Sequence, residues 1–253
     1  MKLSARLQQI ADQIPAGSRL ADIGSDHALL PVSTVQSGIV ISAIAGEVNP
    51  GPFQAAQKQV AEAGLSEVIS VRKGNGLEVI EPGEVDVITI AGMGGSLIVR
   101  ILTEGSEKLE GVSRLVLQPN IGEDVVRRWL VREGWYLVEE HILEEDGKIY
   151  EILTAERVQN ASERNEQLYA ERELQGCGIG LSKEMLISMG PYLVEKTNAA
   201  FFKKWQGEIA KLERIRKSLS ESELEASKQK EKAIASEIEQ IKEVLKCLQK
   251  GRP

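Results

Sequence analysis

Two carboxylates and a glycine turn stand where successive apolar segments end, early in the chain. Asp22 lies near the end of the first segment and precedes Gly24, and Glu47 ends the second segment. In an open α/β sheet, ligands bind at the carboxyl ends of adjacent strands, and glycine lets the backbone approach them closely. A carboxylate at the second strand end accepts hydrogen bonds from both hydroxyls of a ribose. The spacing therefore predicts a site for a nucleoside-type cofactor.

The turn after the first segment discriminates between cofactors. A dinucleotide site requires G-x-G-x-x-G, because a pyrophosphate rests against bare backbone amides. Here the residues after Gly24 are Ser25, Asp26 and His27. Acidic groups beside the turn repel a pyrophosphate but tolerate a sulfonium and an ammonium, so we expect S-adenosylmethionine rather than NAD. The simpler alternative is a strand–helix turn in which Ser25 or Asp26 caps the helix.

Three further strand ends carry groups that suit a nucleoside. After the third segment, glycines flank Asn75, whose carboxamide can donate to and accept from an adenine edge. After the fourth, a glycine turn holds Met93, which can pack on a flat ring. After the fifth, Gln118 and Asn120 flank a proline. Each motif alone is equally well explained as turn chemistry, but the ends of successive strands gather in one site.

The elements that position these groups alternate along the chain. Apolar runs bounded by turn residues predict strands at 18–23, 39–45, 67–72, 85–91 and 112–118. Helical spacing occurs at 4–14, 29–37, 51–63, 94–103 and 122–133. Two more strands, 135–144 and 148–156, flank a hairpin turn. This layout predicts an α/β fold, a Rossmann-like class I methyltransferase domain with a seven-stranded, mostly parallel sheet.

The composition changes near residue 157, beyond which strand signals become rare. Hydrophobic residues then recur at coiled-coil spacing in two stretches. They are Trp205, Ile209, Leu212 and Leu219 in the first, and Ile234, Ile238, Ile241, Leu245 and Leu248 in the second. This pattern predicts an α-helical, antiparallel coiled-coil hairpin. We therefore expect a methyltransferase domain over residues 1–157 and a helical domain over 158–253.

The net charge of −7 is distributed unevenly. Residues 1–157 contain 14 basic and 23 acidic residues, and residues 158–253 contain 17 and 15. The basic residues of 190–219 are Lys196, Lys203, Lys204, Lys211, Arg214, Arg216 and Lys217. A local basic face can bind phosphates even on an acidic protein. A solvated helix face explains the same charges equally well.

Composition also indicates whether the chain can fold by itself and in which compartment it functions. With 253 residues, 42% of them hydrophobic, the chain can bury a full core. No apolar run reaches the roughly 18 residues of a membrane span, and the N-terminus opens an amphipathic helix rather than a signal peptide. Cys177 and Cys247 are far apart and lack metal-ligand spacing, which predicts no metal site and a reduced compartment without disulfides. We expect a cytoplasmic protein.

Taken together, the motifs resemble one enzyme family. They are residues 22–31 (DIGSDHALLP), 45–47 with 49–52, 74–76, 90–95 and 118–120. The set resembles the bacterial tRNA adenine-22 N1-methyltransferases (TrmK) over the whole chain, and the string D-I-G-S-D-H-A is specific to that family. The resemblance implies methyl transfer from S-adenosylmethionine to N1 of an adenine in the tRNA D-arm region. Unlike many related methyltransferases, the chain has Asn75 in place of Asp, and it lacks the Asn/Asp-Pro-Pro-aromatic motif of N6 methylation.

The chemistry of N1 methylation suggests roles for individual residues. Adenine N1 is nucleophilic without a strong base, so the enzyme must chiefly align it and exclude water. Asp26 is the candidate for stabilising the positive charge that develops on the base. His27 is the candidate for orienting the base or relaying a proton, or else it is a capping or packing residue. Asn120, or Gln118, is the candidate for reading the base edge, and the base must be flipped out of its stack.

The cofactor site is expected to use the strand-end residues. Asp22 would position the cofactor through the turn amides or its ammonium, Gly24 would permit close approach, and Glu47 would hold the ribose. The full set of expected cofactor-binding residues is Asp22, Gly24, Ser25, Glu47, Val48, Asn75, Gly76, Ala91, Gly92 and Met93.

We expect tRNA to be bound through its backbone shape, by the catalytic cleft and the basic face of 190–219, without an obligate protein partner. The aromatic residues near this face are better explained as anchors between the hairpin and the catalytic domain. They are Tyr192, Phe201, Phe202 and Trp205. Two alternatives remain. One is a methyltransferase acting on a small molecule or protein, with the hairpin as a dimerisation element. The other is a non-catalytic cofactor-binding module.

Overall fold

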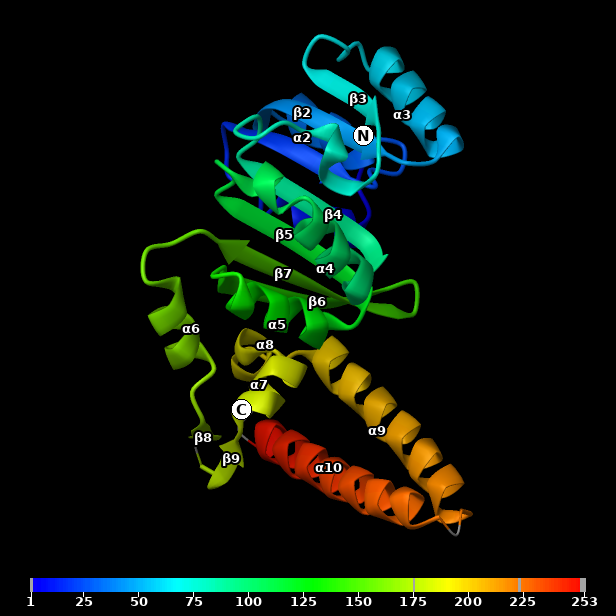
Figure 1. Cartoon of the computed structure of the whole chain (residues 1–253), viewed down its shortest axis with the longest axis vertical. Helices are drawn as coiled ribbons and strands as arrows, with labels where there is room; N and C mark the ends of the chain where they lie inside the picture. Colours follow the sequence, from blue (N-terminus) through cyan, green and yellow to red (C-terminus); the bar gives the residue numbers. More distant parts are fainter. Residues whose placement is uncertain (1, 175, 223, 251–253) are drawn as a thin grey trace. The chain divides into compact units, whose positions relative to one another are not determined.

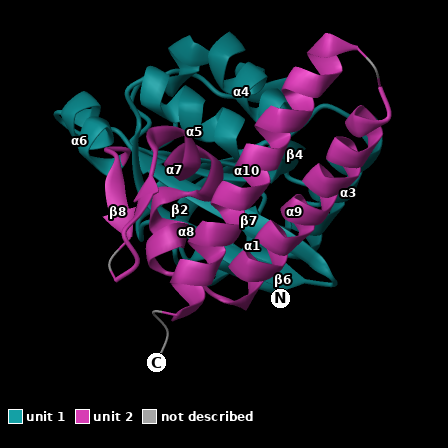
Figure 2. Ribbon diagram, turned by 90° about the horizontal axis from the view of Figure 1, so that it is seen from below, with its two compact units in different colours: residues 1–168 teal, residues 169–253 magenta. Residues whose placement is uncertain are grey.

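The computed structural model describes residues 2–174, 176–222 and 224–250, in two compact units. The units comprise residues 1–168 and 169–253 (Figure 2). We expected the division at residue 157. Helix α6 (Ala161–Leu168), however, packs on strand β6 (Tyr136–Glu145), and Nδ2 of Asn165 donates to the carbonyl of Trp135 at 2.9 Å. These contacts explain why the first unit continues to residue 168.

The first unit is built on a seven-stranded sheet with the order β3-β2-β1-β4-β5-β7-β6 (Figure 1). Besides β6, its strands are β1 (Ser18–Ile23), β2 (Val40–Glu47), β3 (Ile69–Lys73), β4 (Val87–Gly94), β5 (Arg114–Ile121) and β7 (Lys148–Glu156). Strands β1 to β5 pair in parallel, whereas β7 runs antiparallel to both β5 and β6. The predicted mostly parallel sheet, closed by a hairpin, is confirmed.

Helices pack on this sheet through their apolar residues. They are α1 (Ala5–Ala11), α2 (Leu29–Gln36), α3 (Pro50–Glu62), α4 (Gly95–Glu104) and α5 (Glu123–Arg132), with the short 3₁₀ helices η1 (Gly76–Val79) and η2 (Ser106–Leu109). Ile10 of α1, Leu30 of α2 and Val60 of α3 share one buried cluster with strand residues such as Leu20. Helices α4 and α5 contact each other and lie in front of the sheet in Figure 1. The apolar strand residues in this cluster are therefore buried under the helices, and this packing holds the strands, and so their ends, in place.

Helix α1 is anchored at the end of β6. Its N-cap is Ser4, whose Oγ accepts a hydrogen bond from the Leu7 amide at 3.3 Å. The Ala5 amide donates to Oε1 of Glu145, the last residue of β6, at 2.5 Å. Because β6 runs in the same direction as β5, the start of α1 lies at the same edge as the carboxyl ends of the parallel strands.

A charged cluster is buried between α5 and the hairpin strands. Nε of Arg127 lies 2.6 Å from Glu140 of β6, and Nη2 lies 2.5 Å from Glu151 of β7. All three side chains are almost completely excluded from solvent. The positive charge of Arg127 compensates the two buried carboxylates, so removing the arginine would leave buried negative charge uncompensated by it.

The second unit contains the predicted helical hairpin. Its elements are β8 (Arg172–Leu174), β9 (Ile179–Leu181), α7 (Lys183–Met189), α8 (Pro191–Glu195), α9 (Ala199–Ser220) and α10 (Glu225–Lys250). Lys242 pairs with Glu213 at 3.1 Å and Arg216 with Glu231 at 3.5 Å, as expected for antiparallel α9 and α10. The apolar positions of α10 that we predicted from Ile234 to Leu245 are buried in the hairpin. No described helix, in either unit, is long and apolar enough to span a bilayer.

The prediction that the chain lacks a disulfide is wrong. Cys177 and Cys247 are bonded, which joins the segment between β8 and β9 to the last turns of α10. The two cysteines are 70 residues apart in sequence. The helical hairpin returns the chain to β9, and this long-range return is what brings the thiols together.

Candidate active site

The carboxyl ends of the parallel strands form a single edge. In the sheet register, Asp22 of β1 lies between Ala45 of β2 and Thr89 of β4. Further along the same edge, Ala91 of β4 pairs with Gln118 of β5. The motifs predicted from sequence are therefore brought together where ligands bind in open α/β sheets.

Asp22 is buried, and both of its carboxylate oxygens accept hydrogen bonds from neighbouring side chains. Its Oδ2 accepts the hydroxyl of Ser25 and its Oδ1 accepts the hydroxyl of Thr89, both at 2.6 Å. Burial raises the pKa of Asp22, while these two hydroxyls and the charge of Arg6 act in the opposite direction. Ser25 is buried as well. Asp22 and Ser25 therefore fix the turn after β1, and this is how they can support a cofactor.

Glu47 ends β2 with one carboxylate oxygen engaged. Its Oε1 accepts the backbone N–H of Asp26 at 2.5 Å. Within the described ranges, Oε2 accepts no hydrogen bond, so it is available to a ribose hydroxyl. Burial raises the pKa of Glu47, the Asp26 amide lowers it, and the negative charge of Asp26 raises it. Glu47 is thus a largely buried carboxylate at the position where the sequence predicts a ribose.

The turn after β1 runs through left-handed backbone. Gly24 has φ +72°, and Asp26, His27 and Ala28 have φ values of +40°, +68° and +56°. For residues other than glycine this conformation costs roughly 1–2 kcal/mol each, and such strain concentrates at functional sites. Helix α2 has Ala28 as its N-cap and no side-chain cap bond. The alternative in which Ser25 or Asp26 caps α2 is therefore wrong.

Asp26 and His27 project from this turn into solvent. The Asp26 side chain is 82% exposed and that of His27 57% exposed, with 3.6 Å between Oδ1 and Nε2. His27 is consequently neither a capping residue nor a packing residue. A substrate that approaches this edge meets both polar groups.

Gln118 is a buried hydrogen-bond hub. Its Oε1 accepts from the Gly92 amide at 3.1 Å and from Nη1 of Arg6 at 2.6 Å. Its Nε2 donates to the carbonyl of Pro119 at 2.9 Å and to Oδ1 of Asn120 at 3.1 Å. Because Gln118 is fully buried and fully bonded, it does not read a base. Asn120 is exposed, donates to the Gly92 carbonyl at 2.8 Å, and remains the candidate for that role.

The remaining predicted residues flank this centre. Met93 lies against the β1 turn, since a Cβ on Gly24 would come within 2.3 Å of its Cε. Asn75 and Gly76 line a pocket of about 80 Å³ at the start of η1, beyond the end of β3. Val48, next to Glu47, is 53% exposed. Met93 therefore packs between the β1 and β4 turns, while Asn75 follows β3, with strands β2 and β1 between β3 and β4.

Sequence reasoning missed Arg6. This half-buried residue of α1 donates to Gln118, and its Cζ lies 5.3 Å from the centroid of the Tyr150 ring. The sequence offers no motif around Arg6. The amphipathic helix before β1 was the one feature of the sequence that could have indicated Arg6, because the apolar face of such a helix must pack on the sheet.

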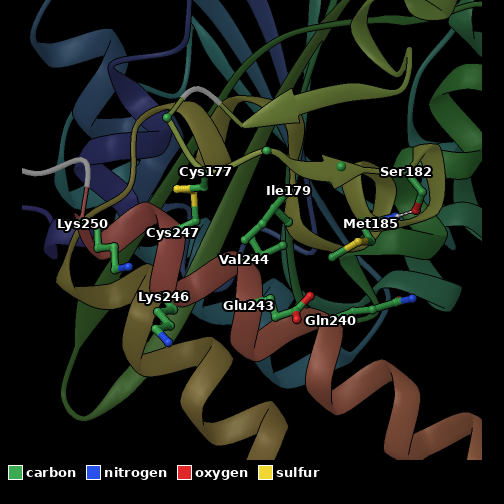
Figure 3. A pocket seen from close by; sticks show the side chains of 13 residues that line it. Cys177, Ile179, Ser182, Met185, Gln240, Glu243, Val244, Lys246, Cys247 and Lys250 are labelled. Carbon is green, nitrogen blue, oxygen red and sulfur yellow. Dashed lines mark hydrogen bonds between the residues drawn. A yellow bond between two sulfur atoms is a disulfide. The ribbon is translucent and has the colours of Figure 1, made fainter.

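A larger pocket, of about 810 Å³, lies in the second unit beside the disulfide (Figure 3). Its lining combines the segment around Gly178 with Met185, Glu243 and Lys246. It contains none of the residues predicted from the strand ends. Over the residues the structure describes, no cluster of three or more His, Cys, Asp or Glu side chains is arranged to hold a metal ion.

Comparison with known proteins decides the family. Residues 20–243 match the family described as TrmK, tRNA (adenine(22)-N(1))-methyltransferase. The chain belongs to this family. It is 48% identical over 246 residues to the tRNA (adenine(22)-N(1))-methyltransferase of Bacillus subtilis strain 168, with 97% of this chain and 98% of the relative covered. The family membership indicated by the sequence motifs is confirmed.

Solved structures of the family match over nearly the whole chain. The crystal structure of the B. subtilis M1A22 tRNA methyltransferase TrmK superposes with a TM-score of 0.85 at 47% identity, covering 96% of this chain and 98% of that one. A Streptococcus pneumoniae protein solved in complex with S-adenosyl-L-methionine has a TM-score of 0.78 at 43% identity, covering 96% and 100%. Both the catalytic fold and the helical C-terminal region are thus shared with the family.

Proposed function

We propose that this chain transfers a methyl group from S-adenosylmethionine to N1 of adenine 22 in tRNA. The observation that carries the proposal is the convergence of the family motifs on one sheet edge, where Glu47 presents an open carboxylate oxygen beside the exposed Asp26. Membership of the TrmK family favours this reaction over a small-molecule or protein substrate and over a non-catalytic module.

The residues at the edge fit this cofactor. Glu47 can accept from the ribose hydroxyls, and Asn75 with Gly76 stands one strand further along for the adenine. The β1 turn has Gly24 for close approach but two acids where a pyrophosphate would lie, which suits a sulfonium. Met93 packs against that turn, Ala91 and Gly92 precede Met93 in β4, and the exposed side chain of Val48 follows Glu47. When bound, S-adenosylmethionine supplies an electrophilic methyl group.

Asp26 and His27 are proposed to act on the target base. Methylation at N1 leaves a cationic adenine, and the exposed carboxylate of Asp26 would stabilise that charge as it develops. His27, 3.6 Å from Asp26, would orient the base or relay a proton. Asn120 keeps one amide proton and an acceptor lone pair beyond its bonds to Gln118 and Gly92, which is sufficient to read a base edge.

The tRNA is proposed to contact the basic face of 190–219 in its D-arm region. On α9, Arg214 and Lys217 are exposed, and within the described ranges no carboxylate pairs with either one. Phe201, Phe202 and Trp205, by contrast, are buried and cannot stack on bases. Binding by this face would therefore be electrostatic and would weaken steeply with salt.

A charge-reversal pair tests the RNA surface. Arg214→Glu with Lys217→Glu should weaken tRNA binding and reduce the slope of log K against log salt by about one per lost phosphate contact. The matched control is Lys58→Glu with Arg132→Glu, which makes the same charge change on the first unit. Equal losses in the two pairs, or no loss in the first, would assign the binding to another surface.

The reaction itself is tested with unmodified tRNA transcripts and labelled S-adenosylmethionine, followed by nucleoside analysis. Labelled 1-methyladenosine is the expected product, and Asp26→Ala should bind cofactor normally while losing turnover. Cofactor binding without a methylated nucleoside would contradict tRNA as the substrate and would favour a small-molecule or protein substrate. Normal turnover by Asp26→Ala would remove Asp26 from the mechanism.

A cytoplasmic location is proposed because tRNA is the substrate. The Cys177–Cys247 disulfide is unusual for a reducing compartment. Cell fractionation combined with thiol alkylation before lysis tests both points. A cytoplasmic protein with two alkylated thiols would show that the bond is open in cells.

A further inference from the structure

Ile121 presents a large apolar side chain to solvent at the carboxyl edge of the sheet. It is the last residue of β5 and is 72% exposed. Exposure alone does not mark a site, since Ile41 is 62% exposed near the start of β2. The two isoleucines differ in position, because the parallel strands begin at one edge of the sheet and end at the other. Ile121 stands at the edge that carries Asp26 and Asn120, where the substrate is proposed to bind.

The side chain of Ile121 has different surroundings from that of Asn120. Consecutive side chains of a strand point to opposite faces. Asn120 is held by its bond to the Gly92 carbonyl. Ile121 pairs with Gly94 of β4, where a Cβ would lie 3.9 Å from the Cγ1 of Ile121, so glycine at this position contributes to its exposure. A base that Asn120 reads therefore leaves Ile121 available to a neighbouring part of the RNA.

The backbone beneath Ile121 is held firmly. The next residue, Gly122, has φ +76° and is the N-cap of α5. A Cβ on Gly95 would come within 2.1 Å of the Gly122 carbonyl oxygen, so the starts of α4 and α5 meet backbone to backbone. Isoleucine itself is β-branched, which restricts its χ1 rotation. Ile121 is thus a stiff apolar side chain on a fixed support, and it loses little conformational entropy when it is covered.

The proposed reaction requires such a side chain. Adenine N1 lies on the base-pairing edge, so the target base has to leave its stack before it can be methylated. Its departure opens a gap between the neighbouring bases, and closing of that gap returns the base to the helix. Proteins that unstack nucleic acids insert Phe, Leu, Ile, Met or Pro side chains between the bases.

Ile121 fits this role better than the other apolar side chains of the edge. Met93 packs against the β1 turn, as shown by its contact with a Cβ placed on Gly24. Val48 is exposed, but β1 and β4 lie between its strand and β5. Leu97, in the first turn of α4, is less exposed than either Val48 or Ile121. We infer that Ile121 enters the gap that adenine 22 leaves and thereby stabilises the flipped-out base. The inference rests on the proposed function and adds the residue that holds the target out of its stack.

The first test compares two tRNA substrates. One is the unmodified transcript, and the other has an abasic nucleotide opposite adenine 22, so that its adenine is easier to flip. On the first substrate, Ile121→Ala should lower kcat/KM on the order of 10- to 100-fold, as expected for the loss of one buried apolar side chain. On the abasic substrate, the ratio of variant to wild type should return to within about threefold of one. Ile121→Leu, which keeps the apolar volume, should retain most of the rate on both.

The second test observes the flipped base directly. A tRNA with 2-aminopurine in place of adenine 22 fluoresces more strongly when this base is unstacked. Wild type with S-adenosylhomocysteine should raise the fluorescence, and saturating Ile121→Ala should raise it at least several-fold less. Calorimetry should give the same affinity of both proteins for S-adenosylhomocysteine, because Ile121 is proposed to contact RNA only.

Controls separate this role from a general effect of truncation. Ile41→Ala makes the same change at a similarly exposed isoleucine of the opposite edge and should leave every readout unchanged. Equal losses on the two substrates would place the action of Ile121 after flipping and overturn the inference, and so would wild-type kinetics of Ile121→Ala. If wild type methylates neither substrate, the proposed function fails as well. If it forms 1-methyladenosine at position 22 and the abasic nucleotide rescues nothing, only the inference fails.

Discussion

The backbone amide of Asp26 donates a 2.5 Å hydrogen bond to Oε1 of Glu47, 21 residues away. This bond joins the two features that the sequence places at adjacent strand ends. It holds the exposed, left-handed turn of the catalytic candidates against the carboxylate that is expected to bind ribose. We therefore expect the proposed cofactor binding at Glu47 to depend on the position of the Asp26 turn.

The coupling predicts a double defect in Glu47 variants. Glu47→Gln keeps an acceptor for the Asp26 amide but loses the charge, so cofactor affinity should fall by about 1.5–3 kcal/mol, as for a hydrogen bond to a charged group. Glu47→Ala removes both bonds and should also lower kcat with saturating cofactor, because the Asp26 turn is released. Titration calorimetry and steady-state kinetics measure the two effects. An Ala variant with the kcat of wild type would show that the turn is held independently.

The raised pKa of Glu47 predicts the pH dependence of cofactor affinity. In the proposed site the ionised carboxylate is the form that accepts the ribose hydroxyls, so cofactor affinity should be full above the folded pKa and should fall as pH decreases through it. Burial raises that pKa, so the fall should begin at a higher pH than the ordinary glutamate value of about 4.3 would give. S-adenosylhomocysteine binding measured over pH 4 to 8 tests this, with Glu47→Gln as a control that should lack the same transition.

Two glycines with the same backbone conformation predict different outcomes. Gly24→Ala and Gly17→Ala both place Cβ on left-handed backbone, at φ +72° and +80°. Each should cost roughly 1–2 kcal/mol of stability. A Cβ at Gly17 meets nothing within 4 Å, whereas one at Gly24 meets Met93 at 2.3 Å in the proposed site. Only Gly24→Ala should therefore weaken cofactor binding; equal affinities in the two variants would remove this turn from the site.

The start of α4 allows no side chain. A Cβ on Gly95 would lie 2.1 Å from the carbonyl oxygen of Gly122, which is backbone and cannot move alone. Gly95→Ala should destabilise the first unit by at least 1–3 kcal/mol, as overpacking does. Gly51→Ala, in α3 with nothing within 4 Å, should instead be neutral or stabilise by up to about 1 kcal/mol. Urea unfolding of the two variants gives the comparison.

The buried arginine of α5 predicts a large loss of stability. Arg127→Met removes the cation that pairs with the buried carboxylates of Glu140 and Glu151, and the free energy of unfolding should drop by about 3–5 kcal/mol. Arg132→Ala, which breaks the exposed pair with Glu133, should cost less than about 1 kcal/mol. Similar losses in the two variants would mean that the buried cluster is solvated in solution.

Local sequence patterns were sufficient to predict the strands, helices and strand ends of the first unit. The strand ends carrying Asp22, Glu47 and Met93 were predicted because apolar runs and glycine turns are short-range signals. The contacts of Gln118 were not, because its partner Arg6 is 112 residues away and depends on how α1 packs. The Cys177–Cys247 bond escaped prediction for the same reason, since it depends on the length of the helical hairpin. The left-handed backbone of His27 could not be predicted either, because residues other than glycine rarely adopt this conformation.

The identity of the methylated atom tests the central claim most directly. A tRNA transcript would be incubated with the protein and labelled S-adenosylmethionine beside a matched transcript in which adenine 22 alone is replaced by guanine. We predict labelled 1-methyladenosine from the first transcript and none from the second. Label in another nucleoside, or 1-methyladenosine that persists after the replacement, would contradict the proposed function.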